Sequence, residues 1–365
     1  MNTDVLPGLV AVILVSIATL AIGTWGLRIS RTTSDFFVAS RTVRPRLNAS
    51  AIGGEYLSAA SFLGVAGLLL TFGAEMLWYP VGWTAGYLVL LVLVAAPLRR
   101  SGAYTLPDFA EARLGSRGVR KLCSVLVVGI GWLYLLPQFQ GAGVTLRATI
   151  DAPAWAGSLV VALVVLVLEL PHLMVPGLAG SVLTGLVTAG AFAAFLSTSS
   201  GLTIAVAGVL SQDVTGRRWG RYRLGGVAAF RVAAAIAVVV PLLMSLPAQD
   251  VAVARTVGLA FAVTASTFAP LLMLGIWWRG LTPHGAVAGL LVGGLGSGIA
   301  VTWTLAASHS PGWTTALLGQ PAAWSVPASF VTMVVVSRLT AASVPAHAGR
   351  FMVRLHTPEA VELQR

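Results

Sequence analysis

Long runs of apolar residues follow one another along the chain, separated by short stretches that contain polar residues and arginines. A helix needs about 20 apolar residues to cross the hydrocarbon core of a bilayer, and most of the runs reach that length. The pattern therefore predicts an all-α polytopic membrane protein with about nine or ten transmembrane segments. A short surface helix is expected over 105–115, because Pro107 suits the first turn of a helix and Gly115 suits its end. The expected membrane segments are 6–27, 47–72, 76–97, 122–146, 154–170, 177–211, 224–246, 256–278, 285–307 and 321–338.

The apolar run at 50–67, SAIGGEYLSAASFLGVAG, differs from a plain membrane span because it contains the carboxylate of Glu55. A carboxylate at the centre of a membrane helix costs roughly 2.5–3.5 kcal/mol on an insertion scale. Gly53 and Gly54 precede the carboxylate and weaken the helix there. Such polarity and irregular backbone are tolerated at membrane depth where they line a protein interior or a cavity. The run therefore predicts a discontinuous helix that forms part of an ion or substrate site.

A second polar stretch, AAFLSTSSGLT at 193–203, lies within another apolar run and holds five hydroxyl side chains. Hydroxyls and freed helix carbonyls supply the oxygen ligands that a sodium ion needs. Serine and threonine also bond the carbonyl four residues earlier or pack neighbouring helices together, so both interpretations stay open. The five hydroxyl residues are Ser197, Thr198, Ser199, Ser200 and Thr203.

Two other runs combine polar residues with a proline. The run at 122–146 contains Pro137 and, on either side of it in the sequence, the polar residues Tyr134, Gln138, Gln140 and Thr145. In the stretch at 263–280, three hydroxyl residues precede a proline, and two tryptophans and an arginine follow it. This second pattern favours a kinked span with an aromatic anchor over a ligand site.

Composition supports a membrane protein. The chain has 365 residues, of which 57% are hydrophobic and 10% are charged, whereas soluble domains carry about 25% charged residues. Cys123 is the single cysteine, which excludes an internal disulfide and a cysteine-based metal site. Neither HExxH nor a phosphate-binding GxxxxGKS sequence occurs, so the sequence favours a protein that is not an enzyme. The glycine-rich stretch Gly293–Gly298 lies in an apolar run and indicates close helix packing.

The net charge of +11 comes almost entirely from arginines that cluster between the apolar runs. The positive-inside rule explains this distribution better than nucleic-acid binding, and no nucleic-acid partner is expected. It predicts a multi-pass protein of the cell membrane with its N-terminus outside and a cytoplasmic C-terminal tail at 341–365. The run at 6–27 lacks a basic residue before it and is expected to be a retained helix rather than a signal peptide. The same rule makes 154–170 and 177–211 both run from outside to inside, which two successive spans cannot do.

Several stretches resemble the solute:sodium symporter family, and most closely its cation/acetate branch. They are SDFFVASRTV at 34–43, AIGGEYLSAASFLGVAG at 51–67, YTLPDFAEARLG at 104–115, GAFAAFLSTSSGLTIAVAGVLSQDV at 190–214 and FAVTASTFAPLLMLGIWWRGLTPHGAVAGLLVGG at 261–294. The resemblance implies a LeuT-like fold of two inverted five-helix repeats with peripheral helices. It also implies transport of a small solute together with sodium by alternating access, with no cofactor other than Na⁺ as the coupling ion.

The resemblance further implies a sodium site between core helices one and eight. Core helix one would supply the backbone carbonyls of Gly54 and Leu57. Core helix eight would supply the Ala194 carbonyl and the hydroxyls of Ser197 and Thr198. Additional candidates for the ion or its coupling are Glu55 and Ser58, and candidate contacts to the solute are Tyr56, Gln138, Gln140 and Thr264.

The chain departs from the family pattern, because the resemblance leaves core helices five to seven without a counterpart. Residues 1–170 would hold the first helix and core helices one to four, and 175–340 would hold core helices eight to ten and two C-terminal helices of the same membrane domain. Loss of three helices would also explain the conflict in orientation.

These observations leave two hypotheses for the function. One is a sodium-coupled symporter of a small monocarboxylate such as acetate, propionate or pyruvate. The other is an internally deleted, transport-inactive family member, either a degenerate product or a membrane sensor or partner.

Overall fold

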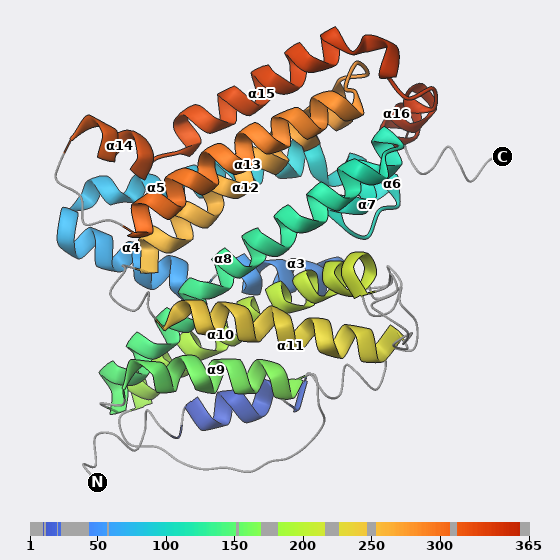
Figure 1. The fold of residues 1–365 in the computed structure, drawn as a ribbon. Coiled ribbons are helices and arrows are strands. Elements are labelled where there is room, and N and C mark those ends of the chain that lie inside the picture. The colour runs from blue at the N-terminus through green and yellow to red at the C-terminus, as the bar shows by residue number, and fades with distance from the viewer. Residues whose placement is uncertain are drawn as a thin grey trace. The chain divides into compact units, whose positions relative to one another are not determined.

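The computed structural model describes residues 10, 12–19, 21–22, 44–56, 58–150, 153–168, 182–215, 226–246, 253–306 and 312–357. All the elements in these ranges are helical, as the all-α prediction requires (Figure 1). Residues 12–19 within the expected span at 6–27 are helical, and the ends of that span lie outside the described residues. The main helices are α3 (Pro45–Tyr56), α4 (Ala59–Phe72), α5 (Trp78–Val89), α6 (Ala96–Ser101), α7 (Leu106–Leu114), α8 (Arg117–Ile150), α9 (Ala154–Leu168), α10 (Val182–Val209), α11 (Gly226–Ser245), α12 (Val253–Trp277), α13 (Pro283–Ala306), α14 (Trp313–Gly319), α15 (Ala322–Leu339) and α16 (Ala348–His356).

Among the described residues, six helical segments are long and apolar enough to cross a membrane. Each overlaps a segment expected from the apolar pattern, and a shorter apolar helix at Ala229–Ser245 overlaps the expected segment 224–246. The first of the six is continuous through α5, the π-helical turn η3 (Leu90–Ala95) and α6. The six are Ala74–Ser101, Arg117–Arg147, Phe192–Gln212, Arg255–Trp277, Pro283–Thr304 and Ala322–Leu339.

The chain divides into two compact units, and the first comprises Met1–Gly73 and Gly131–Val257. In this unit α10 packs against α3, α4, α9 and α11. The C-terminal part of α8 approaches α10 closely at two glycines: the Phe195 ring lies against Gly141, and the Val206 side chain lies against Gly131. The order of these contacts shows that α8 and α10 run antiparallel. Helix α10 is therefore the central element of the first unit.

The helix expected over 47–72 is interrupted, as the sequence predicted. Helix α3 ends at Tyr56, and α4 begins at Ala59 after an extended Ser58 with φ −64° and ψ 130°. The Ser58 amide donates a 2.7 Å hydrogen bond to the Tyr56 carbonyl, which replaces the regular helical pattern at the break. Gly53 and Gly54 lie inside α3, so the interruption falls after them rather than at the glycine pair.

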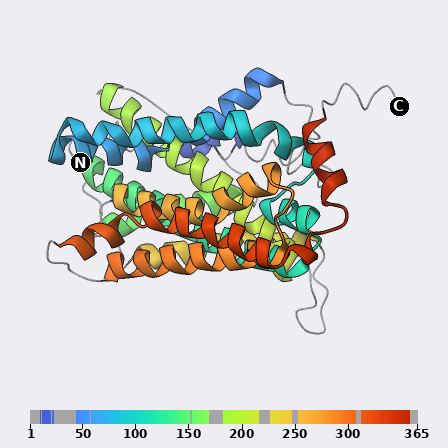
Figure 2. The same cartoon turned by 90° about the horizontal axis from the view of Figure 1, so that it is seen from above.

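The second unit comprises Ala74–Ile130 and Gly258–Arg365. Its most extensive helix pair is α13 and α15, which run side by side (Figure 1, Figure 2). Gly285 and Gly289 let α15 approach α13, and Gly293 lies against the backbone of Ser266 in α12. Gly294 and Gly296 also face neighbouring side chains, whereas Gly298 faces open space. These contacts confirm the prediction that the glycine-rich stretch mediates close helix packing.

Helix α7 confirms the short helix expected over 105–115, but the expectation that it lies at the surface is wrong, because five of its nine residues are buried. Thr105 and Asp108 cap its start reciprocally, Pro107 lies in its first turn, and Gly115 ends it with a φ of +63°. Ala110 and Leu114 are buried against Phe268 and Leu271 of α12. Arg113 is fully buried on the same helix.

The stretch after α15 was expected only as a tail, and the structure adds helix α16 there. Leu355 is fully buried, and the Phe351 ring lies 6.2 Å from the Phe109 ring of α7. Arg100 of α6 donates a 3.0 Å hydrogen bond to the Leu355 carbonyl. These contacts hold α16 against α6 and α7 within the second unit.

Candidate ion site

The structure brings the broken helix and the hydroxyl-rich helix together in the first unit. Helix α3 packs against α10, and the Thr198 hydroxyl lies 3.5 Å from the Glu55 carbonyl. Thr198 is almost fully buried, while Ser197 and Ala194 are partly buried on α10. Tertiary packing thus places oxygen donors from two distant parts of the chain at the same point.

Backbone oxygens at the end of α3 are suited to a cation. The last four carbonyls of a helix lack an amide partner within that helix, and they form the negative end of the helix dipole. In α3 these carbonyls belong to 53–56, which include Gly54 and Glu55, and the Ser58 amide is directed to Tyr56. Leu57 lies outside the described residues, so its predicted role stays a prediction.

The Glu55 carboxylate lies against Gly201 of α10, where any side chain would collide with it. Gly201 therefore leaves room for an acidic side chain beside the run of hydroxyl residues. The sequence alone gave Gly201 no role, although its position inside that run was a signal.

Ser58 and the two glutamines form buried polar contacts within the first unit. The Ser58 hydroxyl lies 3.2 Å from the Gln138 side-chain oxygen and 3.1 Å from its nitrogen. The Thr256 hydroxyl donates to the Gln140 side-chain oxygen at 3.3 Å. Gln138 thus links α8 to the interruption between α3 and α4, a role that the sequence did not suggest. Thr256 was also missed, because only the fold shows that it faces Gln140.

Two more hydroxyls of α10 are buried: the Ser199 and Thr203 side chains have no hydrogen-bond partner among the described residues. They lie one helical turn apart, on the face of α10 that also carries Phe195. Buried polar groups are normally paired, so these two oxygens are available to a ligand or a water molecule.

The remaining candidates are placed as follows. Tyr56 is the last residue of α3 and is partly buried. Thr264 belongs to the second unit, where its hydroxyl donates to the Ala260 carbonyl of α12 at 2.9 Å. Ser266 and Thr267 also bond carbonyls of α12, and Ser266 additionally contacts Ser325 at 2.6 Å. These bonds agree with the interpretation of the stretch before Pro270 as helix packing rather than a ligand site.

A transition-metal centre has no support in the described ranges, because no group of three or more His, Cys, Asp or Glu side chains there could hold a metal. The oxygens at the α3–α10 contact are hard, neutral or carboxylate donors. An interrupted membrane helix whose end faces a hydroxyl-rich helix is typical of secondary transporters that bind monovalent cations.

Comparison with known proteins defines the family. The model of the sodium:solute symporter family matches residues 36–170 and 168–293, which is more than two thirds of the chain. The chain therefore belongs to the sodium:solute symporter family, and it is a multi-pass membrane protein.

Two relatives are described as uncharacterized symporters. YwcA of Bacillus subtilis strain 168 is 35% identical over 143 residues, which cover 39% of this chain and 28% of YwcA. A symporter of Cupriavidus necator is 40% identical over 116 residues, which cover 30% of this chain and 17% of that relative. The chain thus matches less than a third of the length of either relative.

Proposed function

We propose that this chain is a sodium-coupled symporter of a small monocarboxylate such as acetate, propionate or pyruvate. The family supports sodium coupling and a solute as the cargo. The monocarboxylate rests on the likeness of the 51–67 and 190–214 stretches to the cation/acetate branch. The same likeness suggests a LeuT-like arrangement, and the arginine distribution supports an N-terminus outside and a C-terminus in the cytoplasm.

The observation that carries the proposal is the contact between the Thr198 hydroxyl and the Glu55 carbonyl at the end of α3, where the expected span 47–72 is interrupted. In the proposed mechanism, sodium binds to the carbonyls of Gly54 and Leu57, the carbonyl of Ala194, and the hydroxyls of Ser197 and Thr198. Glu55 and Ser58 lie beside this shell. The ion would bridge α3 and α10 and stabilise one arrangement of the break, and binding energy can shift a conformational equilibrium only through such a difference in affinity.

A carboxylate solute bound near the ion would be attracted by it, which couples the two cargoes. The candidate solute contacts in the first unit are Tyr56, Gln138 and Gln140. Since Gln138 contacts Ser58 at the break, sodium binding and solute binding would act on the same backbone segment.

The test is uptake of radiolabelled acetate and pyruvate into proteoliposomes that contain the purified chain. A sodium gradient should drive uptake, and choline in place of sodium should abolish it. Thr198→Ala should lower the apparent sodium affinity about tenfold, which corresponds to loss of one oxygen ligand worth roughly 1–1.5 kcal/mol. Ser245→Ala is the matched control, because that buried hydroxyl donates only within α11, to the Leu242 carbonyl. Equal uptake in sodium and choline would contradict sodium coupling.

A second readout separates sodium binding from transport. A ligand at about 100 times its Kd stabilises a protein by about 2.7 kcal/mol, so sodium should raise the melting temperature of the purified chain. Thr198→Ala should weaken this stabilisation, whereas Ser245→Ala should not. No difference between sodium and choline in the melting temperature would contradict a sodium site.

One observation favours the alternative of an internally deleted, transport-inactive family member, either a degenerate product or a membrane sensor or partner. The two segments matched by the family meet at 168–170, where the sequence suggests that core helices five to seven are missing. That alternative predicts stabilisation by sodium without any uptake.

The topology between 172 and 218 can be tested by cysteine labelling. In a Cys123→Ala background, the single variants His172→Cys and Arg218→Cys should react with an impermeant maleimide from opposite sides of the membrane. Labelling of both from one side would contradict a single crossing between them.

A further inference from the structure

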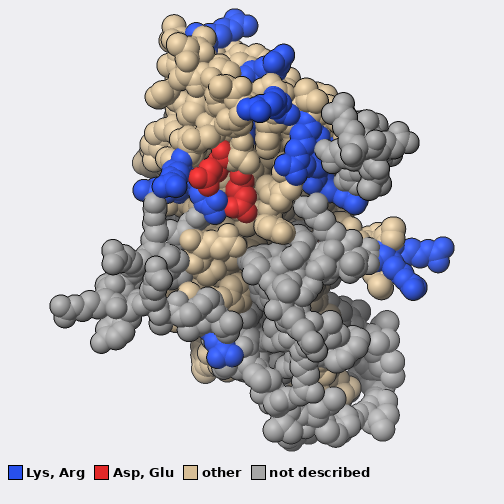
Figure 3. Space-filling view, turned by 90° about the vertical axis from the view of Figure 1, so that its right-hand side faces the viewer, with Lys and Arg blue, Asp and Glu red and all other residues tan. Residues whose placement is uncertain are grey.

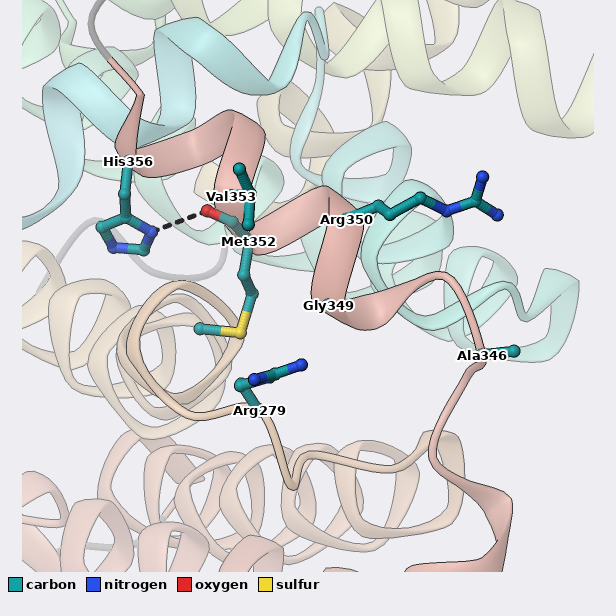
Figure 4. Close-up of a pocket in the computed structure, with 7 residues that line it drawn as sticks. All are labelled: Arg279, Ala346, Gly349, Arg350, Met352, Val353 and His356. Carbon is teal, nitrogen blue, oxygen red and sulfur yellow. Dashed lines mark hydrogen bonds between the residues drawn. The ribbon is translucent and has the colours of Figure 1, made fainter.

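A groove of about 650 Å³ in the second unit combines two arginines and a histidine with apolar side chains (Figure 4). Helix α16 lines the groove with Arg350, Met352, Val353 and His356, and the segment that follows α12 lines it with Arg279. No acidic residue is among the residues that line it. Its chemistry therefore suits an anion that also carries an apolar part.

The arginine charges in the groove are not neutralised by other described side chains. Elsewhere in the same unit, Arg120 forms ion pairs with Asp108 at 2.9 Å and with Glu111 at 2.7 Å. Arg279 and Arg350 are exposed and make no ion pair among the described residues. Among the described residues on the face drawn in Figure 3, lysine and arginine side chains spread widely and the acidic side chains gather in one small patch.

The groove lies close to the ends of two candidate membrane spans. Arg279 follows the span Arg255–Trp277 by two residues, and α16 begins nine residues after the span Ala322–Leu339 ends. Trp277 is half exposed, donates to the Leu93 carbonyl at 3.1 Å and packs its ring 4.8 Å from the His356 ring. Tryptophan is enriched at the level of the lipid headgroups. The ring contact between Trp277 and His356 therefore favours a position of the groove at that level of the membrane.

Apolar surface beside the charges distinguishes a lipid from a free anion. Val353 is 66% exposed on α16, and Met352 lines the groove next to it. Figure 4 shows Arg279, Arg350 and His356 spread along the groove rather than directed at one point. A small inorganic anion could touch only part of this surface, whereas a phospholipid headgroup and the start of its acyl chains could cover the charges and the apolar side chains together.

We propose that this groove binds the phosphate headgroup of an anionic membrane phospholipid. Arg279 and Arg350 attract the phosphate oxygens, and His356 extends the polar part of the groove. Met352, Val353 and Trp277 contact the apolar part of the lipid. The lipid would thereby hold α16 at the membrane surface, independently of the sodium site in the first unit.

The test titrates the purified full chain with phosphatidylglycerol in a phosphatidylcholine background and measures bound lipid by native mass spectrometry. Each basic residue near an anionic lipid surface strengthens binding about fivefold. Arg279→Gln with Arg350→Gln should therefore weaken the affinity for phosphatidylglycerol about 30-fold. Arg117→Gln with Arg338→Gln is the matched control, because it removes the same charge from two exposed arginines outside the groove. Equal binding by the Gln pair and the control would overturn the proposal.

Two further measurements address misfolding and the source of the phosphate. Arg279→Lys with Arg350→Lys keeps both charges and should bind phosphatidylglycerol within about threefold of the parent chain, given that lysine also binds phosphate as a point charge. Loss of binding in this Lys pair, at an unchanged melting temperature, would overturn an electrostatic site. Millimolar inorganic phosphate, compared with chloride at equal ionic strength, should leave lipid binding unchanged. Displacement by inorganic phosphate would overturn the lipid assignment in favour of a free anion.

Discussion

Replacing Arg113 should reveal how strongly one buried charge holds α7 to the end of α12. The guanidinium is fully buried and donates to the carbonyls of Gly275 at 2.8 Å, Trp278 at 3.0 Å and Arg279 at 3.3 Å. No carboxylate pairs with Arg113 among the described residues, so the charge is stabilised by the negative end of α12 and its carbonyls. Burial lowers the pKa of Arg113 to about 10, which leaves it charged at neutral pH.

The magnitude follows from two opposing contributions. A pKa lowered from 12.5 to about 10 corresponds to a desolvation cost of about 3 kcal/mol for the charged form. Hydrogen bonds from a charged donor contribute about 1.5–3 kcal/mol each, so the two shorter bonds offset that cost or exceed it. Methionine at this position would remove the cost, but it would also leave the buried carbonyls without donors at about 1–3 kcal/mol apiece. We therefore expect Arg113→Met to lower the free energy of unfolding by about 2–3 kcal/mol.

The assay is thermal unfolding of the purified chain in detergent, with Arg117→Met as the control. Arg117 lies four residues further on and is exposed at the start of α8, so its replacement removes the same charge with little change in packing. If Arg113→Met unfolds at the same temperature as Arg117→Met, the bonds to the end of α12 do not stabilise the second unit and the reasoning is wrong.

Two glycine substitutions test close approaches in the two units. Gly293→Ala places a methyl group against the backbone of α12 and should lower the free energy of unfolding by about 1–3 kcal/mol. Gly298→Ala on the same helix faces open space and should be neutral or mildly stabilising. Equal melting temperatures of the two variants would contradict the close packing at Gly293. Gly201→Ala displaces the Glu55 carboxylate and should raise the sodium concentration needed for half-maximal stabilisation about tenfold, while Gly53→Ala should leave it unchanged. An unchanged sodium midpoint in Gly201→Ala would show that Glu55 has no influence on the ion.

Much of the helical architecture could be predicted from the sequence, because a helix that crosses a membrane needs a long run of apolar residues. The interruption near Glu55 was predicted from a carboxylate and two glycines in such a run, and the structure confirms it after Tyr56. Helix α16 was missed because it is short and follows the last apolar run, where only packing against α6 and α7 makes it stable.

The candidate site was predicted only as two separate polar stretches, and their residues alone could not show that the stretches meet. The resemblance to the family supplied that pairing, and the fold places Thr198 beside Glu55. The fold also decided what the pattern left undefined: Gly201 leaves space for the Glu55 carboxylate, and Gln138 joins Ser58 at the break. By itself, the sequence determined which segments are apolar enough to enter a membrane and which of them carry polar groups that need an interior. Only the tertiary structure decided which polar groups face one another, because that depends on helix rotation and on close approach between residues that are far apart in the chain.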